Sequence, residues 1–262
     1  MIYKTSIGKG EKVAILHGWS CDHRHMQPLV DLLSDRYHVT NIDLPGRGQS
    51  DWKPGIKTIH DIADLLLPHL PKKAIYIAWS FGGLVSISIA ARYPERVKRF
   101  IGIATTPKFV EEDHWAGISK PGFKLAFLKI KQIGLKAFFK EYYDHEFADF
   151  DPKPASYEEL IRLLDNSKIN IDILLKGIDI CDSTDLRKEF QSICCPIDLI
   201  LSEQDESIPM KAFENIEQLN PNVRIHPFPK AHHMPFWTHP KQFNYLLNHV
   251  LSTIDNIQQE SE

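Results

Sequence analysis

The amino-acid sequence predicts an α/β fold with a mostly parallel central sheet, helices on both faces, and a helical cap inserted into the chain. Strand-like apolar segments alternate with helix-like segments over residues 13–104. The alternation stops after Thr106 and Pro107 and returns at residue 197. Alternation of this kind indicates βαβ units that build a parallel sheet. The 262 residues, 43% of them hydrophobic, suffice for one large core that carries an insertion.

The elements follow from apolar runs and their period. In the first part, strands are predicted at 13–17, 39–43, 74–79 and 99–104, and helices at 26–34, 59–70 and 81–92. Residues 109–193 contain helical segments without a convincing strand, so they are predicted to form the cap, and 1–108 with 194–262 the core. In the last part, a strand at 197–202, a helix at 211–219, a strand at 224–227 and a helix at 241–254 precede a polar tail, 256–262, that is expected to fray.

Composition excludes several classes of protein. The net charge of −3 argues against a nucleic-acid-binding protein. No apolar run approaches the ~18 residues of a membrane span, and the first 12 residues lack the apolar core of a secretory signal. The four cysteines show no C-x-x-C spacing, so neither a zinc site nor a disulfide framework is predicted. We expect a cytoplasmic, monomeric protein with free thiols, no metal and no cofactor.

Ser80 is the candidate nucleophile. It ends the apolar run Ile75–Trp79, and the small residues Ala78, Gly82 and Gly83 surround it. A serine at a sharp strand-to-helix turn, with small neighbours that let the backbone bend, is typical of the nucleophile elbow of serine hydrolases. The alternative is a polar strand end that caps the next helix.

Asp205 and His233 are the candidate partners of Ser80. Each follows a predicted strand, and the carboxyl ends of parallel strands meet at one edge of a sheet. A serine needs a base to take its proton, and the base needs a residue that orients it. Glu203 and Glu206 flank Asp205 as alternative carboxylates, and the local pattern does not separate His232 from His233.

Two backbone amides are the candidate oxyanion donors, because acyl transfer requires donors aimed at the developing charge. One is the amide of Phe81, and the other is that of Trp19 in the turn after an early strand, unless Trp19 is only a core aromatic. His17, at the end of that strand, is predicted to be structural and bonded to backbone groups. The glycine-rich segment 44–50 lacks the G-K-[ST] ending of a phosphate loop, so it is interpreted as a structural turn.

These motifs resemble the α/β-hydrolase superfamily over essentially the whole chain. His17–Trp19, Asp43–Gly48 and Trp79–Gly83 are similar to its oxyanion turn, an early loop and its elbow. Segments 94–97, 113–118, 184–187 and 231–236 resemble more narrowly the methyl ester esterases of biotin synthesis, whose substrate is held on an acyl-carrier protein. The resemblance implies a cap inserted after the sixth strand, and it selects His233, which precedes x-Pro-Phe, over His232.

The resemblance also implies the substrate contacts. Trp19, Ser80 and Phe81 would contact the ester end of the substrate. A looser match places the acyl chain against the cap segment Phe139, Lys140, Glu141, Tyr142 and Tyr143.

Residues 120–140 contain six lysines and no acidic residue. Leu125, Leu128, Leu135 and Phe139 recur at helical steps and are expected to face the core, which leaves the lysines more exposed. A lysine-rich solvated helix is the simplest interpretation. Because acyl-carrier proteins are acidic, we predict instead a docking surface for such a partner. Its candidate residues are Lys124, Lys129, Lys131, Lys136 and Lys140.

The sequence therefore predicts a serine carboxylesterase that acts on a carrier-bound methyl ester. A generic short-chain esterase or carbon–carbon bond hydrolase with the same three residues is the alternative. A hydrolase-fold binding protein without activity is disfavoured by the complete set of candidate residues. A dehalogenase is disfavoured because its nucleophile would be an aspartate at position 80.

Overall fold

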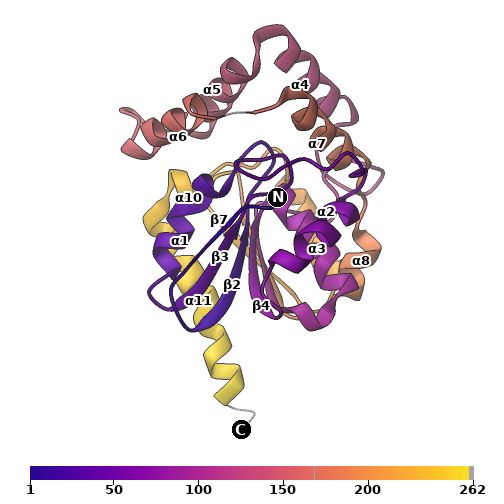
Figure 1. Ribbon diagram of the computed structural model, residues 1–262, viewed down its shortest axis with the longest axis vertical. Coiled ribbons are helices and arrows are strands. Elements are labelled where there is room, and N and C mark those ends of the chain that lie inside the picture. Colours follow the sequence, from indigo (N-terminus) through magenta and orange to yellow (C-terminus); the bar gives the residue numbers. More distant parts are fainter. Residues whose placement is uncertain (168, 260–262) are drawn as a thin grey trace.

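The computed structural model describes residues 1–167 and 169–259, and its centre is a twisted sheet (Figure 1). In this part of the chain the sheet has seven strands in the order β1-β3-β2-β4-β5-β6-β7. β1 pairs antiparallel with β3, and the other neighbours are parallel. The strands are β1 (Lys4–Ile7), β2 (Glu11–Leu16), β3 (Tyr37–Ile42), β4 (Ala74–Trp79), β5 (Val97–Ile103), β6 (Ile197–Ser202) and β7 (Val223–Phe228).

Helices cover both faces of the sheet because its central strands are apolar on both sides. In β4 the side chains of Ala74, Tyr76 and Ala78 join one buried cluster, while those of Ile75, Ile77 and Trp79 join the other. The first cluster is covered by α2 (Ile59–Leu66), α3 (Phe81–Arg92), α8 (Arg187–Ser192) and α9 (Phe213–Leu219). The second is covered by α1 (Gln27–Leu33), α10 (Pro235–Thr238) and α11 (Pro240–Gln259).

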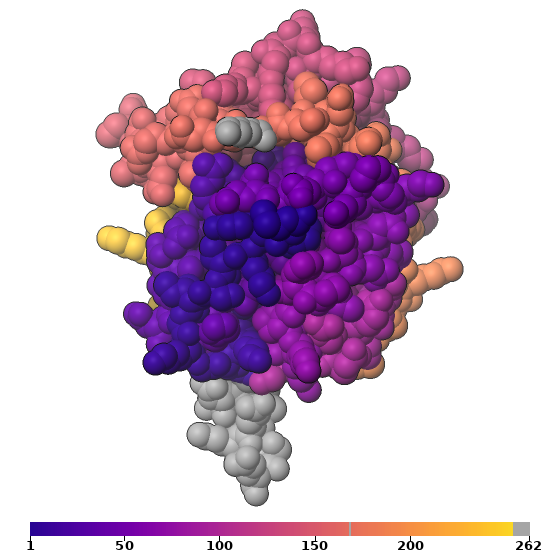
Figure 2. All heavy atoms as spheres, in the orientation of Figure 1, coloured from indigo at the N-terminus to yellow at the C-terminus, as the bar shows by residue number. Residues whose placement is uncertain are grey.

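Four helices between β5 and β6 form a layer over the carboxyl edge of the strands (Figures 1 and 2). We call α4 (Lys120–Ile133), α5 (Leu135–Glu146), α6 (Ala155–Asp165) and α7 (Ile171–Ser183) the cap helices. Although α8 falls within the predicted cap range, it packs on α3. Short 3-10 turns complete the described elements: His23–Met26, Leu67–His69, Pro94–Arg96 and Met210–Ala212. Within these described residues, no helix combines the length and hydropathy needed to cross a bilayer.

The observed elements differ from the sequence expectations chiefly in three places. β1 was missed, because its exposed and mixed residues carry no apolar pattern. The cap helices follow the fifth described strand and not the sixth, since the residues before β2 form the single strand β1. Part of the tail that was expected to fray continues α11 as far as Gln259, and residues 260–262 lie outside the described chain.

Candidate active site

Ser80 lies at the sharp turn between β4 and α3 and has φ 53° and ψ −120°. This is a strained conformation for a residue with a side chain. The amide of Ser80 donates to Ile103 O at 2.9 Å, and its carbonyl accepts from Thr105 Oγ1 at 2.8 Å. A Cβ on Gly82 would lie 2.6 Å from His17 O, so only glycine lets α3 begin this close to the end of β2.

The structure brings Ser80, His233 and Asp205 into one hydrogen-bonded chain. His233 Nδ1 lies 2.7 Å from Asp205 Oδ2, and His233 Nε2 lies 2.8 Å from Ser80 Oγ. A carboxylate only accepts, so Nδ1 carries the proton and Nε2 is left to accept from the hydroxyl. Asp205 is buried, and its other oxygen accepts from Ser207 N at 2.8 Å.

Backbone bonds hold the loops after β6 and β7 together. Gln204 N donates to Ala231 O at 3.1 Å, directly beside Asp205 and near His233. In addition, Trp79 Nε1 donates to His233 O at 2.9 Å. The histidine therefore has a fixed position relative to both partners. Burial alone lowers the pKa of His233, but the charges of Asp205 and Glu146 outweigh it and the pKa is raised.

The alternatives to Asp205 and His233 lie elsewhere. Glu203 and Glu206 are exposed, and the side chain of Glu206 approaches His145 instead. The ring of His232 contacts Gln204 O at 3.0 Å. Neither of these glutamates nor His232 is hydrogen-bonded through its side chain to Ser80, His233 or Asp205.

Glu146, at the end of cap helix α5, contacts the loop that carries His233 and was not predicted from the sequence. Its carboxylate is buried and accepts from His233 N at 3.2 Å and from Met234 N at 2.9 Å. The Tyr142 hydroxyl favours the ionised form of this carboxylate and so lowers its pKa. Burial raises the pKa of Glu146 to about 7. The sequence offered one signal for Glu146, since it lies one helical turn after Tyr142, a predicted substrate contact. Its contact with His233 could not be predicted, because the two residues are 87 positions apart.

Two hydrogen bonds of the His17 ring hold the turn that carries Trp19 in place. His17 Nδ1 donates to Gly18 O at 2.8 Å, and Leu44 N donates to His17 Nε2 at 3.0 Å. Burial lowers the pKa of His17 to about 4, which keeps the ring neutral. The predicted structural role of His17 is confirmed. The Trp19 ring is fixed as well, because its Nε1 donates to Leu174 O of α7 at 3.0 Å. The Phe81 amide is the first of α3 and therefore has no carbonyl partner within its helix.

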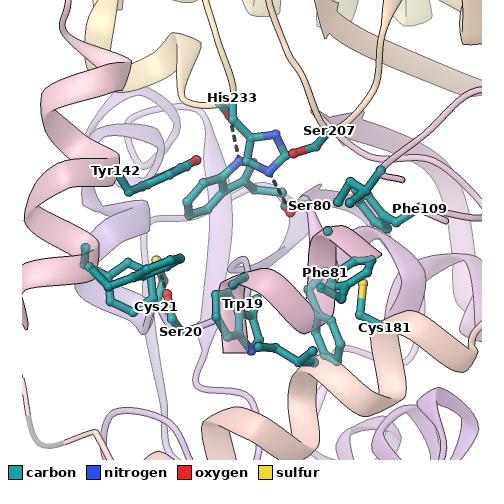
Figure 3. Close-up of a pocket in the computed structure, with 18 of the residues that line it drawn as sticks. Trp19, Ser20, Cys21, Ser80, Phe81, Phe109, Tyr142, Cys181, Ser207 and His233 are labelled. Atoms are coloured by element: carbon teal, nitrogen blue, oxygen red, sulfur yellow. Dashed lines mark hydrogen bonds between the residues drawn. The ribbon is translucent and has the colours of Figure 1, made fainter. Parts of the chain in front are cut away.

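A cavity of about 230 Å³ lies over Ser80, between the core and the cap helices (Figure 3). Its walls are largely aromatic and aliphatic, and Ser80 and His233 supply polar groups at its base. The predicted residues Trp19, Phe81, Phe139, Tyr142 and Tyr143 line it. Further wall residues were not predicted from the sequence: Cys21, Phe109, Ile118, Phe123, Ala126, Phe138, Ile178 and Cys181.

The prediction that Lys140 and Glu141 contact the substrate is wrong, because neither lines the cavity. Lys140 and Glu141 are exposed on the outer side of α5 and pair with Asp144 and Lys129 respectively. The helical period explains this result, because Phe139, Tyr142 and Tyr143 occupy the inner face and leave the two intervening positions outside.

The lysine-rich surface also differs from expectation. Leu125 and Leu128 do not face the core, since their exposed fractions are 59% and 50%. Ile130 is instead the buried residue of α4. Lys129, Lys136 and Lys140 form ion pairs with Glu141, Asp165 and Asp144 at 2.5, 3.4 and 2.8 Å. Within the described chain, Lys124 and Lys131 have no ion pair, and Lys131 Nζ lies 4.3 Å from the centre of the Phe127 ring.

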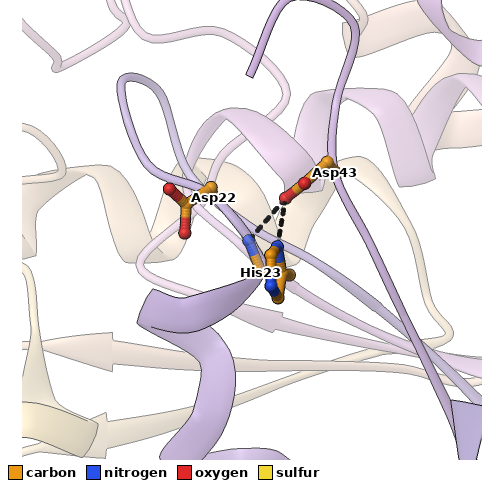
Figure 4. Close-up of side chains that lie close together, drawn as sticks. All are labelled: Asp22, His23 and Asp43. Carbon is orange, nitrogen blue, oxygen red and sulfur yellow. Dashed lines mark hydrogen bonds and ion pairs between the residues drawn. The ribbon is translucent and has the colours of Figure 1, made fainter. Parts of the chain in front are cut away.

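Asp22, His23 and Asp43 approach one another closely enough for a metal site (Figure 4). However, Asp43 Oδ1 accepts from His23 N and Nδ1 at 2.7 and 2.9 Å, and Asp43 Oδ2 accepts from Gln49 N. Both oxygens of Asp22 accept from Arg24. Because each carboxylate oxygen already has a donor, we interpret this cluster as a brace between the Trp19 turn and the loop after β3.

Comparison with known proteins agrees with this geometry. The pattern of the alpha/beta hydrolase fold matches residues 13–240. The chain is 30% identical over 241 residues to the pimeloyl-[acyl-carrier protein] methyl ester esterase of Pseudoalteromonas atlantica, covering 91% of this chain and 93% of that protein. It is also 30% identical over 250 residues to the Vibrio campbellii protein of the same name, covering 92% and 95%.

A solved esterase from Exiguobacterium antarcticum superimposes with a TM-score of 0.85 at 20% identity, covering 96% of this chain and 95% of that one. At this identity the likeness shows the fold. The family pattern spans most of the sequence, and the two relatives cover nearly all of it. The chain therefore belongs to the α/β-hydrolase family, among its carboxylesterases.

Proposed function

We propose that this carboxylesterase uses Ser80, His233 and Asp205 as its catalytic triad. The observation that supports the assignment is the continuous pair of short hydrogen bonds from Asp205 through His233 to Ser80. His233 Nε2 takes the hydroxyl proton as Ser80 Oγ attacks the ester carbonyl. Asp205 holds the productive tautomer and stabilises the imidazolium.

The remaining steps use groups at the same place. The amides of Phe81 and Trp19 bind the tetrahedral oxyanion. His233 then protonates the leaving alkoxide, which departs as an alcohol. A water molecule, deprotonated by His233, hydrolyses the acyl-enzyme and restores Ser80. Each proton passes through His233, which takes it from Ser80 or from water and gives it to the leaving alkoxide or back to Ser80 Oγ, so the chain's own residues suffice for this cycle.

We further propose that the substrate is the methyl ester of a pimeloyl chain carried on an acyl-carrier protein, and that a monomer performs this step of biotin synthesis in the cytoplasm. The names of the two 30%-identical relatives support this substrate. So does the apolar cavity, because each buried methylene contributes about 0.8 kcal/mol. Core residues 1–108 and 194–262 would hold the triad, and the cap 109–193 would enclose the acyl chain.

The outer face of α4 supports docking of an acidic carrier protein. Lys124 and Lys131 have no carboxylate partner in the described chain and flank the exposed Leu125 and Leu128. A basic face with an apolar centre steers an acidic partner and then gives it a surface to bury. Lys129, Lys136 and Lys140 contribute less to this attraction because carboxylates on the cap itself already pair with them.

The double variant Lys124→Glu/Lys131→Glu tests both the substrate and the docking surface. We expect kcat/KM for the carrier-bound methyl ester to fall by roughly 10- to 100-fold at low salt. The rate on a small free aryl ester should stay within about twofold, since that ester needs no docking. The matched control is Lys72→Glu/Lys73→Glu, which makes the same charge change just before β4, at the opposite edge of the sheet.

Two results would contradict these proposals. If the wild-type protein hydrolyses the free ester well and the carrier-bound ester poorly, the generic esterase or carbon–carbon bond hydrolase replaces the carrier-dependent one. If the two double variants lose equal activity on the carrier-bound ester, the docking surface is not on α4.

Glu146→Gln should shift the acid limb of the pH profile of kcat/KM to lower pH. The carboxylate of Glu146 stabilises protonated His233, so removing its charge lowers the pKa of His233 and leaves the base neutral in more acidic solution. The groups facing this carboxylate are His233, Asp205 and Tyr142. A pH series between 4.5 and 8 on the free ester measures the shift.

The matched control for this experiment is Glu141→Gln, which removes a carboxylate from the exposed side of the same helix. We expect its pH profile to be unchanged. An acid limb that stays in place in Glu146→Gln, or moves equally in both variants, would show that Glu146 has no electrostatic effect on the histidine.

A further inference from the structure

Arg47 is a buried cation that forms no ion pair with any residue that the structure describes. It lies in the turn after β3 and its exposed fraction is 8%. Guanidinium atom Nη1 is fully buried and has no hydrogen-bond partner among the described residues. In the described chain no carboxylate forms an ion pair with Arg47. The other arginine near this turn, Arg24, is bound through two nitrogens to Asp22.

The surroundings of Arg47 are fixed by the core and the cap together. A Cβ on Gly177 of α7 would lie 3.6 Å from Arg47 Nη2 and 2.9 Å from Trp19 Nε1. The guanidinium therefore lies beneath a cap helix and close to the Trp19 indole. Burial lowers the pKa of Arg47 to about 10, and Cys21 is the group whose charge opposes this shift. At neutral pH the side chain remains a cation.

A polar cavity of about 270 Å³ adjoins Arg47. Ser20, Gln49 and Ser167 contribute polar groups to its wall, which also includes the ion pair of Asp22 with Arg24. Ser20 also lines the cavity over Ser80. The two cavities are thus neighbours with different chemistry: one is apolar and contains Ser80, and the other is polar and contains an unpaired cation.

We propose that the cavity beside Arg47 is a binding site for a small anion with a carboxylate or phosphate group. A buried charge is strongly unfavourable unless an opposite charge or hydrogen bonds compensate for it. The planar fork of a guanidinium matches two oxygens of a carboxylate or phosphate. The glycine-rich segment 44–50 therefore has a role beyond that of a structural turn, because it supplies Arg47 to this site. It is still not a phosphate loop, because the charge comes from an arginine side chain and part of the cavity wall comes from the cap.

The site predicts an anion-specific stabilisation that depends on Arg47. Thermal unfolding is measured in sodium acetate and, separately, in sodium phosphate, each at constant ionic strength made up with sodium fluoride. We expect one of the two anions to raise Tm in a saturable manner, by roughly 5 °C at a hundredfold excess over Kd. Acetate alone would identify a carboxylate site, and phosphate alone a phosphate site. Binding to the folded protein is followed in parallel by tryptophan fluorescence, because Trp19 lies close to Arg47.

Arg47→Met is the informative variant, because methionine retains an unbranched apolar side chain but removes the charge. We expect it to lose the anion response and to unfold at a Tm no lower than that of the wild type without anion, since an uncompensated buried charge has gone. Arg36→Met is the matched control: it removes an exposed arginine that bonds to Asn248 and should keep the full response. Arg47→Gln provides a second test if the methionine variant does not fold.

Two outcomes would overturn the proposal. In the first, neither anion changes the Tm or the fluorescence of the wild type beyond the fluoride background, which would mean that water compensates Arg47. In the second, Arg47→Met responds as strongly as the wild type, which would place the anion elsewhere. Neither readout involves ester hydrolysis, so this test is independent of the proposed catalytic function.

Discussion

Ser80→Ala is expected to lower kcat/KM for ester hydrolysis by about 10⁴-fold or more, because removing the nucleophile leaves only binding and oxyanion stabilisation. The variant should fold, since the Ser80 backbone is held by Ile103 and Thr105 and not by its own side chain. Within the described chain, the Ser80 hydroxyl is hydrogen-bonded only to His233. Single-substrate kinetics on a free ester, with circular dichroism as the check on folding, measures the effect.

Ser207→Ala is the control for that loss. Ser207 lines the same cavity and its amide bonds to Asp205, but its hydroxyl is not bonded to His233. We expect it to retain activity within about tenfold of the wild type. Comparable losses in the two serine variants would remove the reason for assigning the nucleophile to Ser80.

Asp205→Asn should reduce kcat by about 10⁴-fold while the fold is retained, as expected when the tautomer of a catalytic histidine is wrong. The present Nδ1 to Oδ2 contact of 2.7 Å requires an acceptor on residue 205. An amide group can present its own N–H to Nδ1, which moves the imidazole proton to Nε2 and prevents this atom from accepting the Ser80 proton. Proton NMR of the Nδ1–H signal, together with kinetics, distinguishes a tautomer change from unfolding.

Glu203→Gln and Glu206→Gln are the matched controls for Asp205→Asn, because both remove a carboxylate from the same loop. Both side chains are exposed, so we expect changes below about twofold. A large loss in either control, or a small one in Asp205→Asn, would mean that another carboxylate orients His233.

The central part of this molecule was predictable because its signals are local. β4, Ser80 and α3 follow from an apolar run, a serine among small residues and a helical run, and the structure has β4 and α3 at the predicted bounds. The ends of β6 and β7 placed Asp205 and His233 near Ser80 because parallel strands share one edge. The choice of His233 over His232 needed the family resemblance, since the two neighbours have the same local pattern.

What the sequence could not supply are contacts between distant segments. Glu146 lies 87 residues from His233, and neither position signals the other. Leu125 and Leu128 were assigned inward because a helical stripe does not state which side meets the core. The lack of a counter-ion at Arg47 is likewise visible only after the loop after β3, Trp19 and α7 have been brought together.

Mass spectrometry after reaction with a fluorophosphonate most directly tests whether His233 activates the hydroxyl of Ser80. We expect one adduct, which peptide sequencing maps to Ser80. It should be absent from Ser80→Ala and form far more slowly in His233→Ala than in His232→Ala. An adduct on a different residue, or equal labelling in the two histidine variants, would contradict it.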